Sequence, residues 1–344
     1  MSDFTRFTNP FIYRILLAAA LAAPAGFAAD GVIEISQARA LEGGITEMDQ
    51  PGFPVTLSRT GAYLLTENLE VEEAGLTAIE IVAPTVDLDL NGFVIEGPVV
   101  CDFQERGDSC SGSVQGLGGW GVDVVFDGHG GKVHGGSIRG MGRGGIILAT
   151  VGFTVSDMTI VGNGGEGIWS PGFGVMGAFL IESNVVTHNR SIGIDVSLSL
   201  VRNNTVFRNG SWGINAFKSN SVENTVSSNA GVGIQGSSAN GLIRANVVAA
   251  NTGAGIASAS CLILDNVSAE NGQEQLDMSA GVGEGGAGWG GNNLTRKGLP
   301  GQCGIGPCEL FTPPAAPGSA FEVSPNTCNG ALCDPPEPPI VQPL

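Results

Sequence analysis

The sequence predicts an all-β fold, a parallel β-helix in which coils of short strands stack on one another. The first observation is a motif of the form Asn-x-Val-x-x-Asn-x-x-x-Gly-Ile, which starts at Asn184, Asn204, Asn224 and Asn246, with a decayed copy at Asn266. The second is its spacing, because the second asparagine recurs at 189, 209, 229 and 251, in steps of 20, 20 and 22 residues. Such a fixed period indicates stacked repeats. The third is that the valines and isoleucines show no helical spacing, so that stacking coil on coil is the simplest way to bury them.

The second asparagines of the motif are predicted to form a structural column, consisting of Asn189, Asn209, Asn229 and Asn251. Stacked strands lie about 4.8 Å apart, and an amide carries both donors and an acceptor, so these side chains can hydrogen-bond along the stack. A weaker copy puts Asn163 in the same register, and the copy before it has Met141 at that place. The glycine before each isoleucine, at 167, 193, 213, 233 and 255, is expected to supply the permissive backbone of a bend.

The segments outside the repeats have distinct compositions. Residues 1–28 are predicted to be a secretory signal peptide, because Arg6 and Arg14 precede the apolar run ILLAAALAA, and Gly26 and Ala28 suit a cleavage site. Residues 29–60 are expected to form an N-terminal cap that shields the first coil. The β-helix is predicted over residues 60–300, with a loop-like insertion at 101–121. Residues 301–344 contain cysteine and much proline, and are predicted to form a disordered tail.

The charge of the chain limits its partners. The net charge is −18, and removal of the signal peptide, with two arginines and Asp3, makes it −19. Nucleic acid is excluded as a partner, because its binding needs clustered basic residues, and polyanions should be repelled. Apart from the signal peptide, which is too short for a lasting span, no segment is apolar enough to cross a membrane. We therefore expect a secreted or periplasmic protein, or one on the outer cell surface.

Seven cysteines in an exported chain predict disulfide bonds. Cys101 and Cys110 flank a short polar segment whose length suits a loop bridge. Four more cysteines allow three pairings, and structural bridges are favoured over a zinc site; these are Cys303, Cys308, Cys328 and Cys333. Cys261 precedes the apolar run LIL and is expected to be buried.

The repeats, together with TGAYLLTENLEVEEAGLTAIEIVAPTVDLDLNGFVIEGP from Thr60 to Pro98, resemble secreted bacterial right-handed parallel β-helix repeat proteins of the pectin lyase-like superfamily. The resemblance covers roughly residues 50–335 and implies a right-handed β-helix. This scaffold carries lyases, hydrolases, epimerases and adhesins, so it does not fix the function. The Trp-Ile-Asp-His region and Arg-x-Pro-x-x-Arg of pectate lyases and the Asp-Pro-His-Asp of alginate epimerases are missing from the sequence.

Lyases on this fold use arginine or lysine as the base, so the resemblance makes Arg202, Arg244 and Lys218 the catalytic candidates. Registering the coils places the two arginines at the same motif position two coils apart, with Lys218 in the intervening connection. Glu182 should be the stacked neighbour of Arg202. It is a candidate for substrate binding, and the alternative interpretation is a solvated ion pair.

Three further residues are candidates for substrate binding. Trp212, together with Phe207 and Phe217 on the same coil, could form a sugar-stacking platform or a side-chain ladder. His188 and Arg208 share the position before the second asparagine and should lie one coil apart. The position after the repeated isoleucine forms an outward polar column, which includes Trp169, Asp195 and Asn215.

Two other groups of acidic residues deserve a chemical interpretation. Asp123 and Asp127, with His129 nearby, could supply the two carboxylates of a glycoside hydrolase, but a strand and its turn are the favoured interpretation. Asp87 and Asp89 make a bound Ca²⁺ conceivable, and no other cofactor is expected. The sequence does not identify a complete set of metal ligands.

The leading functional hypothesis is an exported β-helix protein that binds or processes an extracellular or envelope polysaccharide, with a lyase-like activity if it is catalytic. The alternative is a non-catalytic structural or adhesive surface protein. A complete acid-base arrangement on one face would favour the enzyme, whereas smooth columns of Asn, Ser, Gly and Ala would favour the alternative. The sequence leaves the oligomeric state open.

Overall fold

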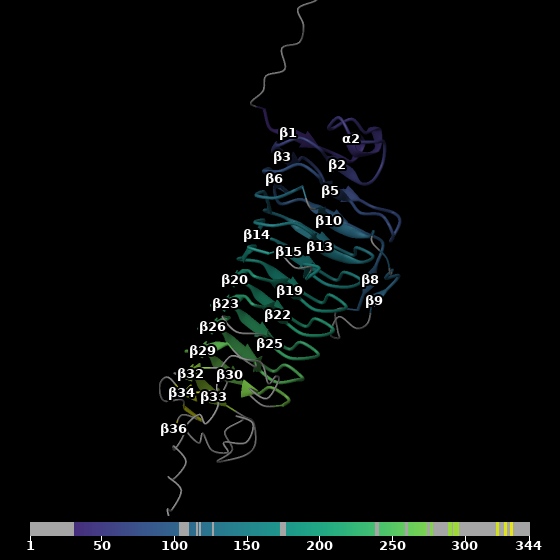
Figure 1. Ribbon diagram of the computed structural model, residues 1–344. Coiled ribbons are helices and arrows are strands. Elements are labelled where there is room, and N and C mark those ends of the chain that lie inside the picture. Colours follow the sequence, from purple (N-terminus) through teal and green to yellow (C-terminus); the bar gives the residue numbers. More distant parts are fainter. Residues whose placement is uncertain are drawn as a thin grey trace, which may run out of the picture. The chain divides into compact units, whose positions relative to one another are not determined.

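A computed structural model describes residues 31–102, 110–114, 116, 118–125, 127–172, 177–237, 241–258, 261–273, 276–277, 288–290, 292–295, 321–322, 327–328 and 331–332. The unit that begins at Ile33 is a right-handed parallel β-helix, as the sequence predicted (Figure 1). The predicted signal peptide and much of the predicted tail lie outside the described residues. In the part of the chain that is described, no helix is long and apolar enough to cross a membrane.

Successive coils add strands to three long sheets of 12, 10 and 12 strands, which we call sheet 1, sheet 2 and sheet 3. Sheet 1 contains β1 (Ile33–Ile35), β3 (Gly61–Leu65), β6 (Val86–Asp89), β11 (Lys132–His134), β14 (Thr154–Ser156), β17 (Leu180–Glu182), β20 (Leu200–Arg202), β23 (Asn220–Val222), β26 (Leu242–Arg244), β29 (Leu262–Leu264), β32 (Gly288–Gly290) and β34 (Phe321–Glu322).

Sheet 2 contains β2 (Val55–Leu57), β5 (Ile79–Ile81), β10 (Trp120–Val124), β13 (Gly144–Leu148), β16 (Ile168–Trp169), β19 (Ile194–Ser197), β22 (Ile214–Phe217), β25 (Ile234–Ser237), β28 (Ile256–Ser258) and β31 (Leu276–Asp277). Sheet 3 contains β4 (Leu69–Glu70), β7 (Val94–Glu96), β12 (Ser137–Arg139), β15 (Thr159–Val161), β18 (Val185–Thr187), β21 (Thr205–Phe207), β24 (Thr225–Ser227), β27 (Val247–Ala249), β30 (Val267–Ala269), β33 (Asn293–Thr295), β35 (Thr327–Cys328) and β36 (Ala331–Leu332). The last three strands of the chain thus fall within the range predicted as a tail.

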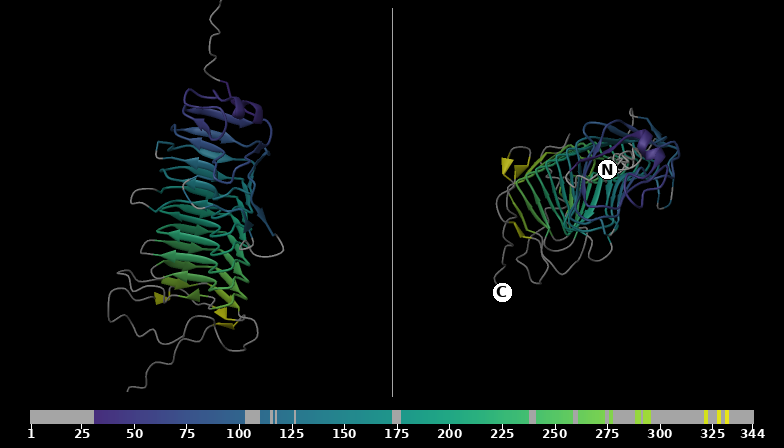
Figure 2. Two further views of the ribbon diagram at one scale, coloured as in Figure 1. Left: turned by 90° about the vertical axis from the view of Figure 1, so that its right-hand side faces the viewer. Right: turned by 90° about the horizontal axis from the view of Figure 1, so that it is seen from above.

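The first coil begins inside the range predicted for the cap, because β1 pairs with β3 and β2 pairs with β5. The helix α2 (Gln37–Glu42) lies at this end of the stack (Figure 2). The Ser36 hydroxyl accepts a hydrogen bond from the Arg39 backbone N–H at 3.3 Å and begins the helix. Ala40 is fully buried in the core, so the helix contributes apolar surface to the N-terminal end of the stack.

The core lies between the sheets, where side chains alternate along the strands and each three-residue strand of the regular coils in sheet 3, such as β21 and β24, turns its middle valine inward. In sheet 2, Ile194, Ile214 and Ile234 are paired in register, and all three are fully buried. Val186, Val206 and Val226 form the matching column in sheet 3. Because each coil repeats the same inward residues, the core continues along the stack without a second domain.

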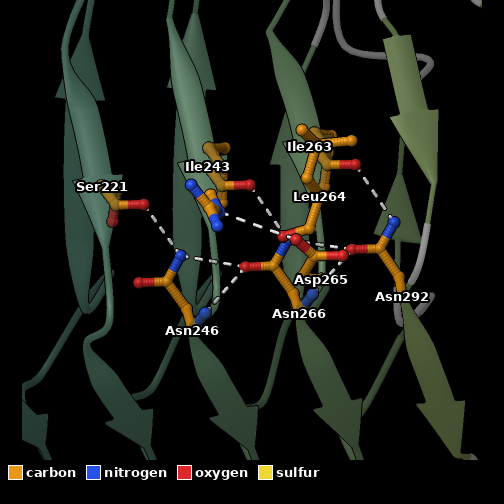
Figure 3. A network of polar contacts seen from close by, with 9 residues as sticks. Ser221, Ile243, Asn246, Ile263, Leu264, Asp265, Asn266 and Asn292 are labelled. Carbon is orange, nitrogen blue, oxygen red and sulfur yellow. Dashed lines mark hydrogen bonds and ion pairs between the residues drawn. The ribbon is translucent and has the colours of Figure 1, made fainter. Parts of the chain in front are cut away.

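Two asparagine columns, rather than the one predicted, run along the inside of the stack. The predicted column is present: Asn209 Nδ2 donates to Asn229 Oδ1 at 3.0 Å, and Asn189 Nδ2 donates to Asn209 Oδ1 at 3.0 Å. The first asparagines of the motif form the second column, in which Asn246 Nδ2 donates to Asn266 Oδ1 at 3.0 Å (Figure 3). Each amide also bonds backbone groups, so buried polar atoms of the turns are satisfied within the stack.

The residue before each of the column asparagines from Asn184 to Asn271 adopts a left-handed conformation although it is not glycine. In the second-asparagine column these residues are His188 (φ 53°), Arg208 (φ 53°), Ser228 (φ 58°), Ala250 (φ 55°) and Glu270 (φ 54°). A left-handed conformation costs free energy for residues with a Cβ. The hydrogen bonds of the adjacent asparagine hold the backbone there, which explains why the asparagine recurs and the preceding residue varies.

The predicted reason for the glycine before each isoleucine is wrong. The backbone φ of Gly167, Gly193, Gly213 and Gly233 lies outside the left-handed region. These glycines are needed for space instead: a Cβ at Gly193 would lie 2.6 Å from Val206 Cγ1 and 2.8 Å from Asn209 Nδ2. The corner at this position is therefore closed by direct contact between the glycine backbone and the next coil.

The insertion after β7 contains an antiparallel pair of strands, β8 (Val100–Cys101) and β9 (Cys110–Ser111). The predicted disulfide bond between Cys101 and Cys110 is confirmed. This hairpin contacts later coils, because the Val114 backbone N–H donates to Gly142 O at 2.9 Å and the Arg190 guanidinium bonds the Ser113 hydroxyl. The hairpin thus clamps neighbouring coils at one corner.

The other cysteines are only partly described. Cys261 is buried as predicted, and burial raises the pKa of its thiol while a hydrogen bond with Ser258 opposes this. The backbone of Cys328 lies in β35, but its side chain lies outside the described residues, as do Cys303, Cys308 and Cys333.

Candidate functional site

The predicted catalytic cations lie on sheet 1 and at its edge. Arg202 pairs in register with Val222, and Val222 pairs with Arg244, so the two arginines share a column two coils apart. Arg202 Nε donates to Glu182 Oε2 at 2.7 Å, and Arg244 Nε lies 3.6 Å from Asp265 Oδ2. Lys218 is exposed at the corner after β22, with its Nζ 5.4 Å from the Phe217 ring centroid. Both arginines are thus neutralised by a carboxylate, which leaves little positive field for an anionic sugar.

His188 and Arg208 lie one coil apart as expected, but their environments differ. Arg208 is exposed. His188 is 7% exposed, its Nδ1 lies 2.8 Å from Thr187 Oγ1, and its ring meets Phe207 edge to face at 5.9 Å. Because the His188 side chain is buried, we assign it a structural role and do not include it in the candidate site.

The three aromatic residues of the coil 207–217 lie in different places. Phe207 faces outward from sheet 3, Phe217 ends β22 of sheet 2, and Trp212 lies in the corner between those strands. They therefore do not form a single stacking platform. Trp212 is partly exposed and adjoins sheet 2.

The acidic residues near the N-terminal end are divided between two sheets. Asp123 lies in β10 on sheet 2, whereas Asp127 and His129 are exposed in the following turn, as the strand-and-turn interpretation predicted. Asp87 lies on sheet 1, 3.3 Å from Lys132 Nζ and 3.0 Å from His134 Nε2.

Asp89 accepts a hydrogen bond from the Asn91 backbone N–H at 2.7 Å and lies 3.8 Å from His134 Nδ1. Both oxygens of Asp87 and Oδ1 of Asp89 thus lie against protein partners, which include the Lys132 ammonium group. In the described part of the chain no group of three or more His, Cys, Asp or Glu side chains is placed to hold a metal ion. These residues do not fit a calcium site.

A second face, the outside of sheet 2, collects polar and aromatic residues in one continuous column. The strand pairings order this column as Glu80, Asp123, Ile147, Trp169, Asp195, Asn215, Gln235 and Ala257. Paired strands lie about 4.8 Å apart, so the side chains follow one another along the stack at that spacing. The half with Trp169, Asp195 and Asn215 is the outward column that the repeat predicted.

An aromatic stack lies at the middle of this column. The rings of Trp120 and Trp169 are nearly parallel, with an interplanar angle of 9° and centroids 5.7 Å apart. Trp120 begins β10 and covers Gly144, where a Cβ would collide with its ring. Trp120 is buried and Trp169 is partly exposed, so Trp169 presents the stack to solvent.

Arg143 joins the aromatic stack to a carboxylate. Its Cζ lies 5.6 Å from the Trp120 ring centroid and 5.7 Å from that of Trp169, distances at which a guanidinium is attracted to the aromatic ring. Its Nη1 lies 3.4 Å from Glu166 Oε2, close enough for an ion pair although the two are not aligned as a hydrogen bond. Arg143 and Glu166 come from the loops that precede β13 and β16.

Two carboxyl groups on this face titrate close to neutrality. Burial, together with the neighbouring Glu80 carboxylate, raises the pKa of Asp123 to about 6. Burial also raises the pKa of Asp195 to about 6; the hydrogen bond from Asn215 opposes the shift, and the Glu166 charge adds to it. Asn215 Nδ2 donates to Asp195 Oδ1 at 2.8 Å. Carboxyl groups with such pKa values can donate or accept a proton near pH 6.

The raised pKa values predict how stability depends on pH. The folded state holds protons on Asp123 and Asp195 up to about pH 6, whereas an unfolded chain releases them near pH 4. The stabilisation is therefore complete below pH 4 and is lost as the pH rises through 6. Asp123→Asn should raise the unfolding free energy at pH 7.5 by about 1–2 kcal/mol, and the gain should vanish at pH 4 in urea titrations. An equal effect at both pH values would contradict the raised pKa.

The fold and this face define a right-handed β-helix protein with an aromatic and acidic site on one sheet. A family profile described as a right handed beta helix region matches residues 144–283. A solved double mutant of the periplasmic alginate epimerase AlgG is similar over 80% of this chain and 77% of that chain, at 16% identity with a TM-score of 0.55. The A-module of the Azotobacter vinelandii mannuronan C-5 epimerase AlgE4 is similar over 79% of this chain and 87% of that chain, at 15% identity with a TM-score of 0.51. These identities establish a shared fold, and a search of curated protein sequences finds no match.

Proposed function

We propose that the outer face of sheet 2 binds an extracellular or envelope polysaccharide, and that the protein is exported to meet it. The stack of Trp120, Trp169 and Arg143 beside two carboxyl groups with raised pKa is the observation that carries this proposal. The partly exposed Trp169 offers an apolar aromatic surface to a sugar ring, and Asp195 and Asn215 on the next coils offer hydrogen bonds.

The regular column suits a linear polymer. A chain that lies along the stack would meet Glu80, Asp123, Trp169, Asp195, Asn215 and Gln235 in turn. Two solved proteins with this fold carry the names of alginate and mannuronan epimerases, which supports a polysaccharide as the ligand. The Cys101–Cys110 disulfide bond supports export to an oxidising compartment.

Within this proposal, Asp123 and Glu80 are the acid-base pair of a processing reaction. They lie on paired strands, with one carboxyl of raised pKa beside another carboxylate. Carboxyl groups about 5 Å apart that flank a glycosidic bond support hydrolysis with retention of configuration. The protonated Asp123 would donate its proton to the leaving oxygen as Glu80 attacks the anomeric carbon and forms a glycosyl ester. Water, deprotonated by Asp123, would then displace Glu80 and release the sugar. Without such a reaction, the same face would serve as a binding surface of a structural or adhesive protein.

Replacement of Trp169 by alanine should weaken glycan binding at least about tenfold, which corresponds to about 1.4 kcal/mol. The loss is expected because the aromatic surface offered to the sugar is removed. Binding of purified protein to neutral, cationic and anionic glycans, measured by affinity electrophoresis, checks this. Phe217→Ala is the matched control, since it also truncates a solvent-facing ring, 42% exposed, on the same sheet. Equal binding by both variants and the wild type would exclude this face as the site.

The same glycans distinguish processing from binding. Hydrolysis releases reducing ends, whereas a lyase produces an unsaturated product that absorbs ultraviolet light. Reducing ends that disappear in Asp123→Asn would support the acid-base pair. An unsaturated product that is lost in Arg202→Ala or Arg244→Ala, and kept in Asp123→Asn, would move the active site to sheet 1.

A further inference from the structure

The charges around the Trp169 stack are mostly negative. Glu80, Asp123 and Asp195 lie in the outward column, and Glu166 lies in the loop beside it. Among the described residues, exposed charged groups in the connections that enter and leave sheet 2 include Glu72 and Glu73 before β5, Asp127 after β10, Arg59 after β2, Arg190 before β19, Arg208 before β22 and Lys218 after β22. Arg190 is bonded to Ser113 of the hairpin, and Lys218 lies over Phe217.

The cation within the site is not available to an anionic ligand. The Arg143 side chain is 20% exposed, forms the ion pair with Glu166, and lies against both tryptophan rings. A uronic acid carboxylate placed on Trp169 would therefore meet Asp195 on the next coil and Asp123 two coils away, and the described residues of the outward column include no cation. The net charge of −18 adds a long-range repulsion of polyanions.

A sugar with a protonated amino group meets the opposite situation. Its ammonium group could form charge-assisted hydrogen bonds with Asp195 or Asp123, and near Trp169 it gains a cation–π attraction. The aromatic stack determines where the sugar binds, and the carboxylates favour a sugar with a positive charge over one with a negative charge. We propose, on the basis of the function proposed above, that the sheet 2 face takes a polysaccharide of amino sugars and rejects polyuronates.

Three soluble probes of equal length separate charge from shape: a chitosan oligosaccharide, its fully N-acetylated form, and an oligogalacturonate. Their binding to the full chain is measured by calorimetry at about 0.15 M salt, which screens exposed charges beyond about 8 Å. We expect the chitosan probe to bind at least about tenfold more tightly than the acetylated one, and the oligogalacturonate not to bind. Because the pKa values of Asp123 and Asp195 are about 6 and the amino groups of chitosan lose their protons in the same pH range, chitosan affinity should be highest near about pH 6 and lower at about pH 5 and pH 8.

Variants decide whether the chitosan probe occupies this site or only the negative surface. Trp169→Ala and Asp195→Asn should each reduce its affinity about tenfold or more. Asp265→Asn, which removes an exposed charge near sheet 3, is the matched control and should leave the affinity unchanged. Equal losses in the control and in Asp195→Asn would mean non-specific attraction and would overturn the inference.

The outcomes also separate this inference from the proposed function. If the acetylated probe or the oligogalacturonate binds as tightly as chitosan, and Trp169→Ala weakens it, the face binds glycans but does not select amino sugars. If no glycan of any charge depends on Trp169, the proposed function itself is wrong.

Discussion

Asn209→Ala should destabilise the protein by about 3 kcal/mol, the upper end of the cost of a stranded buried polar group, because several groups lose their partner at once. The Asn209 side chain accepts from Asn189 Nδ2 at 3.0 Å and from the Asn189 backbone N–H at 3.1 Å. It also donates to Asn229 Oδ1 at 3.0 Å and to Val186 O at 3.1 Å. Alanine leaves buried groups on both neighbouring coils without these partners. A melting temperature lower by about 6–12 °C is the expected readout.

Asn220→Ala is the matched control for the asparagine column. Asn220 is exposed on sheet 1, and its side chain accepts one hydrogen bond, from the Leu242 backbone N–H at 3.1 Å. Water can replace that bond, so the melting temperature should fall by no more than about 2 °C, in keeping with a surface substitution. If Asn209→Ala and Asn220→Ala had the same melting temperature, the asparagine column would not stabilise the stack.

The repeat made the middle of the fold predictable from sequence, because stacking places equivalent residues in one column. The register of Arg202 and Arg244, the inward Val206 and the hydrogen-bonded Asn209 all follow from aligning the motifs. The left-handed corners were missed for a physical reason. Their side chains vary from histidine to alanine, and the conformation at His188 is held by the next asparagine rather than by the residue itself.

The candidate site was predictable only in part. Trp169 and Asp195 were placed in an outward column because they follow the repeated isoleucine. Arg143, Glu166 and Trp120 lie where the motif has decayed, in or next to loops whose course the repeat does not specify. Glu80 and Asp123 lie on paired strands although the insertion separates them in the sequence. No local sequence pattern predicts that these two strands are neighbours. The sequence predicts Arg202 and Arg244 as catalytic candidates because they are cationic. In the structure they form ion pairs with Glu182 and Asp265.

Gly193→Ala should strongly destabilise the protein, because it adds a methyl group where two coils touch. The new Cβ would lie 2.6 Å from Val206 Cγ1, 2.7 Å from Gly213 O and 2.8 Å from Asn209 Nδ2. Overpacking a core costs about 1–3 kcal/mol and occasionally more, and here the displaced atoms include the asparagine amide. We therefore expect a loss of at least about 3 kcal/mol, seen as a lower urea midpoint.

Gly75→Ala is the control for this substitution, because Gly75 has no heavy atom within 4 Å of the added Cβ and its φ is not left-handed. Its urea midpoint should stay the same or rise slightly, since alanine restricts the unfolded chain.

A second substitution separates the two explanations for the repeated glycine. If the glycine supplied backbone freedom, Gly193→Ala would be costly through its φ, and enlarging the surrounding space would not help. If it supplies room, Val206→Ala should restore part of the stability lost in Gly193→Ala, because removing Cγ1 opens the space that the new methyl group needs. A double variant that is less stable than the wild type by the full sum of the two single losses would exclude the steric explanation.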